Sequence, residues 1–316
     1  MRISTQLVFD RGINAISSQQ KVLVALQTQV SSGQRINKPS DDPLAMSTAL
    51  AAQDGVAQNT QFNRNVTNLR NQLNEVDTAM GSASEIMQSI KESLVSANNS
   101  TLSTSDKKIL GSDLQAKMQQ LMGIANRKSN SGAYMFAGNK ETTAPFNAAP
   151  ADAPIGTPAH DDPDTYYRYQ GDTAVRKVAI STSRSLDVGV TANDMFSDGT
   201  TTGNNYFSAL QKVINELKSG TSASVQSMIN SQSSTIDDTF DHFQLARTKI
   251  GGRLRELDTV ESLNTSASDE LQRIATEAVS VDYAKVISDL SQTQFALEAS
   301  QKTFAQVSKL SLFNML

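Results

Sequence analysis

The sequence predicts a mainly α-helical protein: a long helical rod or coiled coil built from both halves of the chain, with a small antiparallel β domain inserted in the middle. Two observations support this fold class. Apolar residues recur in steps of three and four in both halves of the 316-residue chain, which is typical of helices that pack along a seam. Between residues 141 and 203 this spacing stops, and five of the seven prolines lie between Pro145 and Pro163, which favours turns and short strands.

The first rod helix is predicted over residues 43 to about 98. Asp42 offers a capping carboxylate before Pro43, and proline is favoured in the first turn of a helix. Apolar or small side chains then alternate in steps of four and three, which predicts a seam that another helix must cover. The seam residues are Phe62, Val66, Leu69, Leu73, Val76, Met80, Ala83, Met87, Ile90 and Leu94.

Two further helices complete the predicted rod. One carries a seven-residue repeat at Ile229, Ile236, Phe243, Ile250 and Leu257, and the other opens at Ser103 and repeats at Leu110, Leu114, Met118, Leu121 and Ala125. We interpret these stripes as core. Gly251 and Gly252 interrupt the first repeat. Because a glycine costs about 1 kcal/mol relative to alanine inside a helix, we expect close packing or a bend there.

The two chain ends carry thinner apolar stripes. Residues 1–31 and 271–316 keep helical spacing, but Ser, Thr, Asn and Gln fill most gaps, and Thr293 and Ser300 occupy seam positions. Such helices gain most of their stability from packing, so we expect both ends to be disordered in the free monomer and to order against a partner. The alternative is an intramolecular bundle that is already closed in the monomer.

The middle of the chain has the pattern of short strands. We predict strands at 166–169, 174–182 and 186–190, and in the last of these Leu186, Val188 and Val190 alternate on one face. The predicted domains are therefore a terminal coiled coil of residues 1–42 and 271–316, a helical rod of residues 43–140 and 204–270, and an outer β-rich variable domain of residues 141–203.

Composition argues against several classes of function. The chain has no Cys, no Trp and only two histidines, His160 and His242, which excludes disulfides, cysteine catalysis and a histidine-rich metal centre. A formal net charge of −4 gives no basic surface for nucleic acid, and no apolar run is long enough for membrane insertion. No motif pairs an acid, base or nucleophile with a partner, so we expect a structural or binding protein, with neither enzyme activity nor a cofactor or metal.

Several segments carry a family resemblance. The stretch LQTQVSSGQRINKPSDDP at 26–43 resembles the N-terminal signature of bacterial flagellins and hook-associated proteins. Within that superfamily, four features are similar to the hook-associated protein 3 family, the hook-filament junction proteins of the flagellum. They are the opening MRISTQ, the segment GAYMFAG at 132–138, APF at 144–146, and the ending from SQKTF at 300–304 to LSLF at 310–313.

The resemblance implies a structural component of the bacterial flagellum. Such a protein would form a ring that links hook to filament and templates flagellin polymerisation. It would be extracellular after export by the flagellar type III apparatus. The implied partners are like subunits, the hook-side junction protein (hook-associated protein 1), flagellin and a cytoplasmic export chaperone, with no nucleic acid and no membrane insertion.

The resemblance also assigns the apolar stripes at both ends to an assembly interface. Its predicted residues are Ile3, Leu7, Ile13, Ile16, Leu23, Leu26, Val286, Leu290, Leu297, Phe304, Leu310, Leu312 and Phe313. Arg35 is a candidate contact between stacked rods of neighbouring subunits. A capped turn that links two helices explains the stretch around Arg35 equally well.

Three other functions compete with a junction protein. A filament-forming flagellin shares the helical seams. A cytoplasmic signalling hairpin of the chemoreceptor kind is also rich in Ala, Ser and Gln, but it needs an uninterrupted hairpin where this chain has prolines and predicted strands. A secreted enzyme with a helical stalk needs a catalytic set that the sequence lacks.

Overall fold

The computed structural model describes residues 3–147, 154, 156–197 and 205–313, and for 3–6, 8 and 309–313 it describes the backbone alone. The chain divides into two compact units. The terminal unit contains Met1–Asn59 and Ser266–Leu316, and the rod unit contains Thr60–Thr265.

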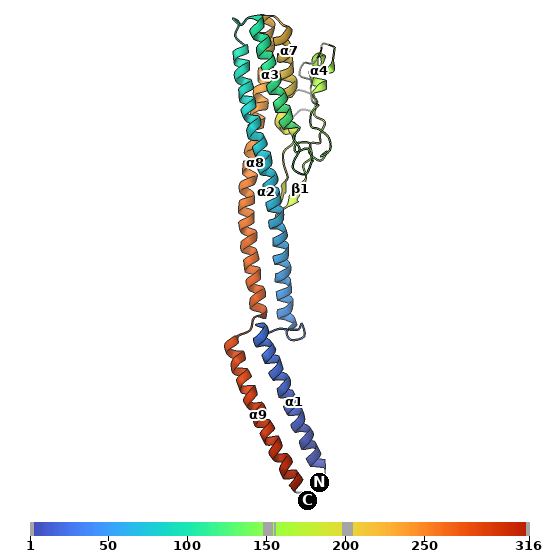
Figure 1. The fold of residues 1–316 in the computed structure, drawn as a ribbon, viewed down its shortest axis with the longest axis vertical. Coiled ribbons are helices and arrows are strands. Elements are labelled where there is room, and N and C mark those ends of the chain that lie inside the picture. Colours follow the sequence, from blue (N-terminus) through green and yellow to red (C-terminus); the bar gives the residue numbers. More distant parts are fainter. Residues whose placement is uncertain (1–2, 148–153, 155, 198–204, 314–316) are drawn as a thin grey trace. The chain divides into compact units, whose positions relative to one another are not determined.

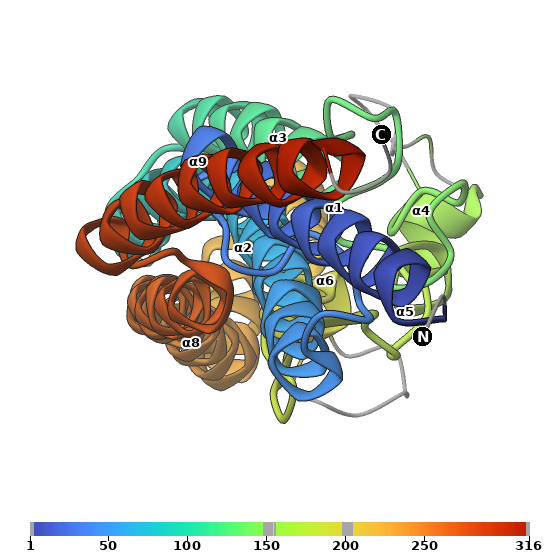
Figure 2. The same cartoon turned by 90° about the horizontal axis from the view of Figure 1, so that it is seen from below.

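The terminal unit is built from the two ends of the chain. Helices α1 (Ile3–Ser32) and α9 (Tyr283–Phe313) lie side by side (Figures 1 and 2). The unit also contains the first part of α2 (Pro43–Ala97) and the last part of α8 (Ser222–Val279). Asp42 Oδ1 accepts a hydrogen bond from Ala45 N at 3.1 Å, so the predicted capping of α2 is confirmed.

The predicted seams are buried in the rod unit, through which α2 and α8 run side by side (Figure 1). Every α2 seam residue from Phe62 to Leu94 is buried, and so are the repeat residues of α8 from Ile229 to Leu257. Ion pairs join the two helices outside the seam, for example Lys91 Nζ to Asp237 Oδ1 at 2.7 Å. The interpretation of these stripes as core is confirmed.

Helices α3 (Thr104–Ala125) and α7 (Tyr206–Ser219) pack against each other in the same unit. Ser103 opens α3 with a capping box: its Oγ accepts from Asp106 N at 3.2 Å, and Asp106 Oδ2 accepts from Ser103 N at 3.3 Å. The two helices approach closely at Gly111, where an added Cβ would lie 3.2 Å from Leu217 Cβ.

Between α3 and α7 the described chain forms loops, three short helices and one hairpin. The helices are α4 (Pro158–Asp161), α5 (Pro163–Tyr166) and α6 (Ala192–Phe196), and the strands are β1 (Lys177–Ala179) and β2 (Ser185–Asp187). The strands pair antiparallel, with Val178 opposite Leu186. The prediction of a small antiparallel β unit is confirmed, although the described strands are only three residues long.

The strand predicted at 166–169 is wrong. Pro163 opens α5, which ends at Tyr166, and a proline is readily accepted in the first turn of a helix. Tyr167 is fully buried, and its hydroxyl donates to Gln211 Oε1 at 3.1 Å. The tyrosines at 166–169 therefore pack in the aromatic core of the rod unit, and this segment does not form a β-strand.

The motif at 132–138 fastens the loops of the rod unit. Phe136 O accepts hydrogen bonds from Ala192 N at 2.8 Å and from Tyr169 Oη at 3.1 Å. Gly138 has φ 65°, and an added Cβ would lie 2.1 Å from Asp172 O. Only glycine fits at this position, so the family motif has a folding role.

The APF motif at 144–146 anchors the next loop. Asn126 Nδ2 donates to Phe146 O at 2.8 Å, and Phe146 N donates to Asn126 Oδ1 at 2.9 Å. The ring of Phe146 lies 4.8 Å from that of Phe207 and 6.2 Å from that of Phe196, centroid to centroid. These contacts explain the motif by packing.

Gly251 and Gly252 lie inside the continuous helix α8. An added Cβ at either position would meet no atom within 4 Å. The expectation of close packing at these glycines is therefore wrong within this chain.

Candidate assembly interface

The two segments that join the helices of the terminal unit pair with each other. Residues 33–42 connect α1 to α2, and residues 280–282 connect α8 to α9. Arg35 N donates to Val279 O at 2.8 Å, and Val281 N donates to Gly33 O at 3.2 Å. This short antiparallel pairing ties both linkers together, and we call it the linker clasp.

The side chain of Arg35 extends the linker clasp. Its Nη1 lies 3.2 Å from Asp42 Oδ2, and its Nη2 donates to Ala278 O at 3.2 Å. The hydrogen bond from Ala45 N, followed by that from Arg35, holds the pKa of the Asp42 carboxyl below its usual value. These contacts support the capped-turn interpretation of this stretch, and a contact of Arg35 with a neighbouring subunit stays a prediction.

Most of the predicted interface residues that the structure describes are half-buried within the terminal unit. The half-buried residues are Ile16, Leu23, Leu26, Leu290, Leu297 and Phe304, and Val286 is fully buried. Phe304 packs edge-on against Phe9, with ring centroids 5.3 Å apart. The stripes read from the sequence therefore meet largely inside the chain, between α1 and α9.

The remaining predicted residues are exposed or fall outside the description. Leu7 is 48% exposed and Ile13 is 54% exposed. The side chains of Ile3, Leu310, Leu312 and Phe313 lie outside the described residues.

A second group of apolar residues in the terminal unit was not among the predicted interface residues, although Tyr283 and Val307 of this group lie on the stripe of the C-terminal segment. These large side chains are exposed: Val22, Val24, Leu44, Leu50, Tyr283, Ile287, Phe295 and Val307. Phe295 is the extreme case on α9, at 76% exposed. A stripe of period 3.6 identifies residues that face the nearest helix, and most of this group lies off that stripe. Exposed apolar side chains indicate a contact with another protein where they form a contiguous patch.

Comparison with known proteins identifies the family. Flagellar hook-associated protein 3 of Salmonella typhimurium is 30% identical over 322 residues, an alignment that covers 100% of this chain and 99% of that protein. The Escherichia coli protein of the same name is 28% identical over 331 residues, with the same coverage. The chain belongs to the flagellar hook-associated protein 3 family. It is therefore a structural protein of the bacterial flagellum, as the resemblance in its motifs predicted.

Two further comparisons concern the helical region and the fold. Residues 3–141 match the family model of the bacterial flagellin N-terminal helical region. A solved flagellar hook-associated protein from Vibrio parahaemolyticus has a similar fold, with a TM-score of 0.65 at 22% identity over 76% of this chain and 100% of that one. The mainly helical fold class is confirmed.

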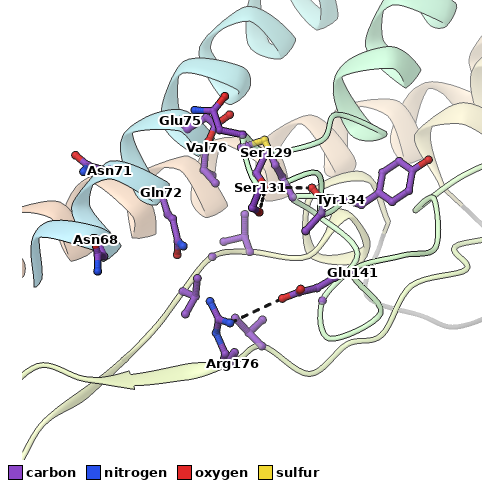
Figure 3. Close-up of a pocket in the computed structure, with 18 residues that line it drawn as sticks. Asn68, Asn71, Gln72, Glu75, Val76, Ser129, Ser131, Tyr134, Glu141 and Arg176 are labelled. Carbon is purple, nitrogen blue, oxygen red and sulfur yellow. Dashed lines mark hydrogen bonds and ion pairs between the residues drawn. The ribbon is translucent and has the colours of Figure 1, made fainter. Parts of the chain in front are cut away.

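The rod unit of this hook-associated protein 3 family member also contains a cleft of about 700 Å³ (Figure 3). Four polar residues of α2 line one wall: Asn68, Asn71, Gln72 and Glu75. Across the cleft, Arg176 Nη1 lies 3.9 Å from Glu141 Oε1, and both side chains are more than half exposed. Such a pair contributes little. The lining contains the carboxylates of Glu75 and Glu141, and the hydroxyl of Ser129 lies 2.7 Å from that of Ser131 and donates to Ala133 O at 3.3 Å.

Neither a metal-binding cluster nor a membrane-spanning helix is present in the described part of the chain. There, no three His, Asp or Glu side chains gather in a group that could hold a metal ion. None of the described helices is both long and apolar enough to cross a membrane.

Proposed function

We propose that the chain forms the junction ring that links the flagellar hook to the filament and templates flagellin polymerisation. Its full-length relation to flagellar hook-associated protein 3 of Salmonella typhimurium supports this function most directly. In this proposal like subunits meet through the terminal unit. The ring has the hook-side junction protein (hook-associated protein 1) on one side and flagellin on the other.

The proposed assembly interface includes more than the residues read from the sequence. The half-buried stripe that contains Leu23 and Leu297 holds the two ends of one chain together. The exposed apolar residues, of which Phe295 is the most exposed on α9, face neighbouring subunits in the proposed ring. Burial of about 25 cal/mol for each Å² of apolar surface would drive this contact.

The proposed route to the outside of the cell is export through the flagellar type III apparatus. The helices α1 and α9 carry stripes with many polar interruptions, such as Thr293 and Ser300. Segments of this kind bury little apolar surface, so they cost little free energy to unfold for export. In this proposal a cytoplasmic chaperone covers their apolar side before export. In this proposal, residues 1–42 and 271–316 are disordered in the free monomer and become ordered in the ring.

Deletion of the gene tests the function. We expect cells that make hooks without filaments, swim poorly and release flagellin into the culture supernatant. A plasmid copy of the gene should restore filaments. Motile deletion cells with attached filaments would contradict the proposal.

Electron microscopy separates a junction protein from a filament-forming flagellin. Purified chain is incubated alone and with flagellin, in the presence of isolated hooks that carry hook-associated protein 1. We expect short caps from the chain alone and filaments only when flagellin is added. Long filaments from the chain alone would assign it as a flagellin.

A further inference from the structure

Three glycines in the N-terminal segments of the terminal unit each receive a large side chain from the C-terminal segments. An added Cβ at Gly12 of α1 would lie 2.7 Å from Phe304 Cδ2 of α9, and one at Gly55 of α2 would lie 2.7 Å from Leu271 Cδ1 of α8. An added Cβ at Gly33, in the linker clasp, would lie 2.9 Å from Tyr283 Oη. A Cβ this close would force a shift. The shift is cheap where the near atom ends a flexible side chain, as Tyr283 Oη and Leu271 Cδ1 do, so the ring of Phe304 against Gly12 is the strictest of the three contacts.

The spacing of the Gly12–Phe304 and Gly33–Tyr283 contacts fits a single antiparallel register. Gly12 and Gly33 are 21 residues apart, and so are Tyr283 and Phe304. Two antiparallel helices that start from the linker clasp therefore bring both pairs together at once. A shift of one turn would place each large side chain against a residue that has a Cβ.

The apolar stripes alone define this register weakly. Polar residues such as Thr293 and Ser300 occupy seam positions in α9, so shifted pairings bury similar surfaces. We propose that the pairs Gly12–Phe304, Gly33–Tyr283 and Gly55–Leu271 form a register lock, which allows the two ends of the chain to pair in one alignment only.

Other glycines of the chain show that the close contacts are not a general property of helical glycine. Gly12 and Gly55 have ordinary helical backbone, and only Gly33 among the three lock glycines has a positive φ, of 69°. In contrast, an added Cβ at Gly123, Gly251 or Gly252 meets no atom within 4 Å. Alanine is more favourable than glycine inside a helix, so the absence of a side chain at Gly12 and Gly55 is explained by the partner that lies against them.

The lock is tested by counting flagellar filaments on cells. This inference rests on the proposed function, because the filament count reports the lock only if the chain is needed for filament assembly. Deletion cells carry plasmids with Gly12→Leu, with Phe304→Ala, with both substitutions combined, or with the matched control Gly251→Leu. Filaments per cell are counted, and the exported variant is measured in the supernatant. We expect at least a tenfold loss of filaments for Gly12→Leu, recovery in the double variant to within twofold of Phe304→Ala alone, and no loss for the control.

The second helical pair repeats the test independently. Gly55→Leu should lose filaments, and addition of Leu271→Ala should restore them. The lock is overturned if Gly12→Leu cells keep filament counts within twofold of wild type. It is also overturned if the double variants have as few filaments as the single ones, and this second criterion holds even where the single variant is degraded in the cell. If deletion cells with an empty plasmid keep their filaments, the proposed function fails. The lock is then judged in the purified full chain under the alternative that the terminal bundle is already closed in the monomer. Gly12→Leu should speed amide exchange of α1 and the double variant should reverse it, and a wild-type α1 without protection would overturn the lock.

Discussion

The guanidinium of Arg35 and the carboxylate of Asp42, 3.2 Å apart, join two helix ends in the terminal unit. Asp42 caps the first turn of α2 through Ala45 N, and Arg35 donates to Ala278 O in the last turn of α8. A negative charge is favourable at a helix N-terminus and a positive charge at a C-terminus. Each partner of this pair therefore complements one helix dipole as well as the other partner.

Arg35→Ala should loosen the linker clasp. The substitution removes the side-chain bond to Ala278 O and the ion pair to Asp42, so the backbone bond from Val281 N to Gly33 O should open more often. We expect several-fold faster amide exchange in residues 33–42 and 280–282 of the chain assembled on isolated hooks, where both segments are ordered in the proposed ring. Arg273→Ala is the control, because Arg273 pairs only with Glu270 and Glu277 inside α8. Equal exchange in both variants would show that Arg35 does not hold the clasp.

Acid should open the same clasp. The folded protein holds the pKa of Asp42 below the ordinary value of 3.8, first through Ala45 N and then through Arg35. A lowered folded pKa stabilises the fold fully above the unfolded pKa, and this stabilisation is lost as the pH falls through the folded value. Exchange in residues 33–42, followed from about pH 5 to about pH 2 and corrected for intrinsic rates, should therefore rise in the acid range. In the Asp42→Asn variant, amides of residues 33–42 should exchange faster than in wild type at about pH 5, and their exchange should change less as the pH falls.

Gly138→Ala should destabilise the rod unit far more than Gly132→Ala. Both glycines have positive φ, 65° and 84°, so both variants carry a backbone strain of about 1–2 kcal/mol. The added Cβ at Gly138 also lies 2.1 Å from Asp172 O, whereas that at Gly132 meets nothing within 4 Å. We expect Gly138→Ala to lower the free energy of unfolding by at least about 2 kcal/mol more. Urea unfolding followed by tyrosine fluorescence measures the difference, and equal values would contradict the steric argument.

The sequence predicted the long helices well because their packing is periodic. The α2 seam from Phe62 to Leu94 is buried throughout, and a seam of that length is encoded in local spacing. The loops are different: Tyr167 and Gln211 meet across 44 residues, and no local pattern encodes that contact. The β-strand prediction at 166–169 failed for this reason.

Only the half-buried residues of the candidate interface, which lie between α1 and α9, were predictable from the sequence. Leu23 and Leu297 lie on stripes that a nearby helix half-buries, and periodicity finds such residues. Val24 and Phe295 remain exposed, so no partner within the chain imposes a period on them. The contacts of Arg35 with Ala278 span 243 residues, and they depend on where two linkers meet in the fold.

Gly251→Ala and Gly252→Ala should each stabilise the chain. Both glycines lie inside α8 with open space at the added Cβ, and alanine is favoured over glycine there by about 1 kcal/mol. For a chain of this size each substitution should raise the Tm by about 2–4 °C, measured by circular dichroism. Gly55→Ala provides the contrast, because its added Cβ lies 2.7 Å from Leu271 Cδ1 and the gain in helix propensity is offset by a clash. A lower Tm for the α8 variants would contradict this prediction, because it would mean that an added methyl group at Gly251 or Gly252 destabilises the folded chain.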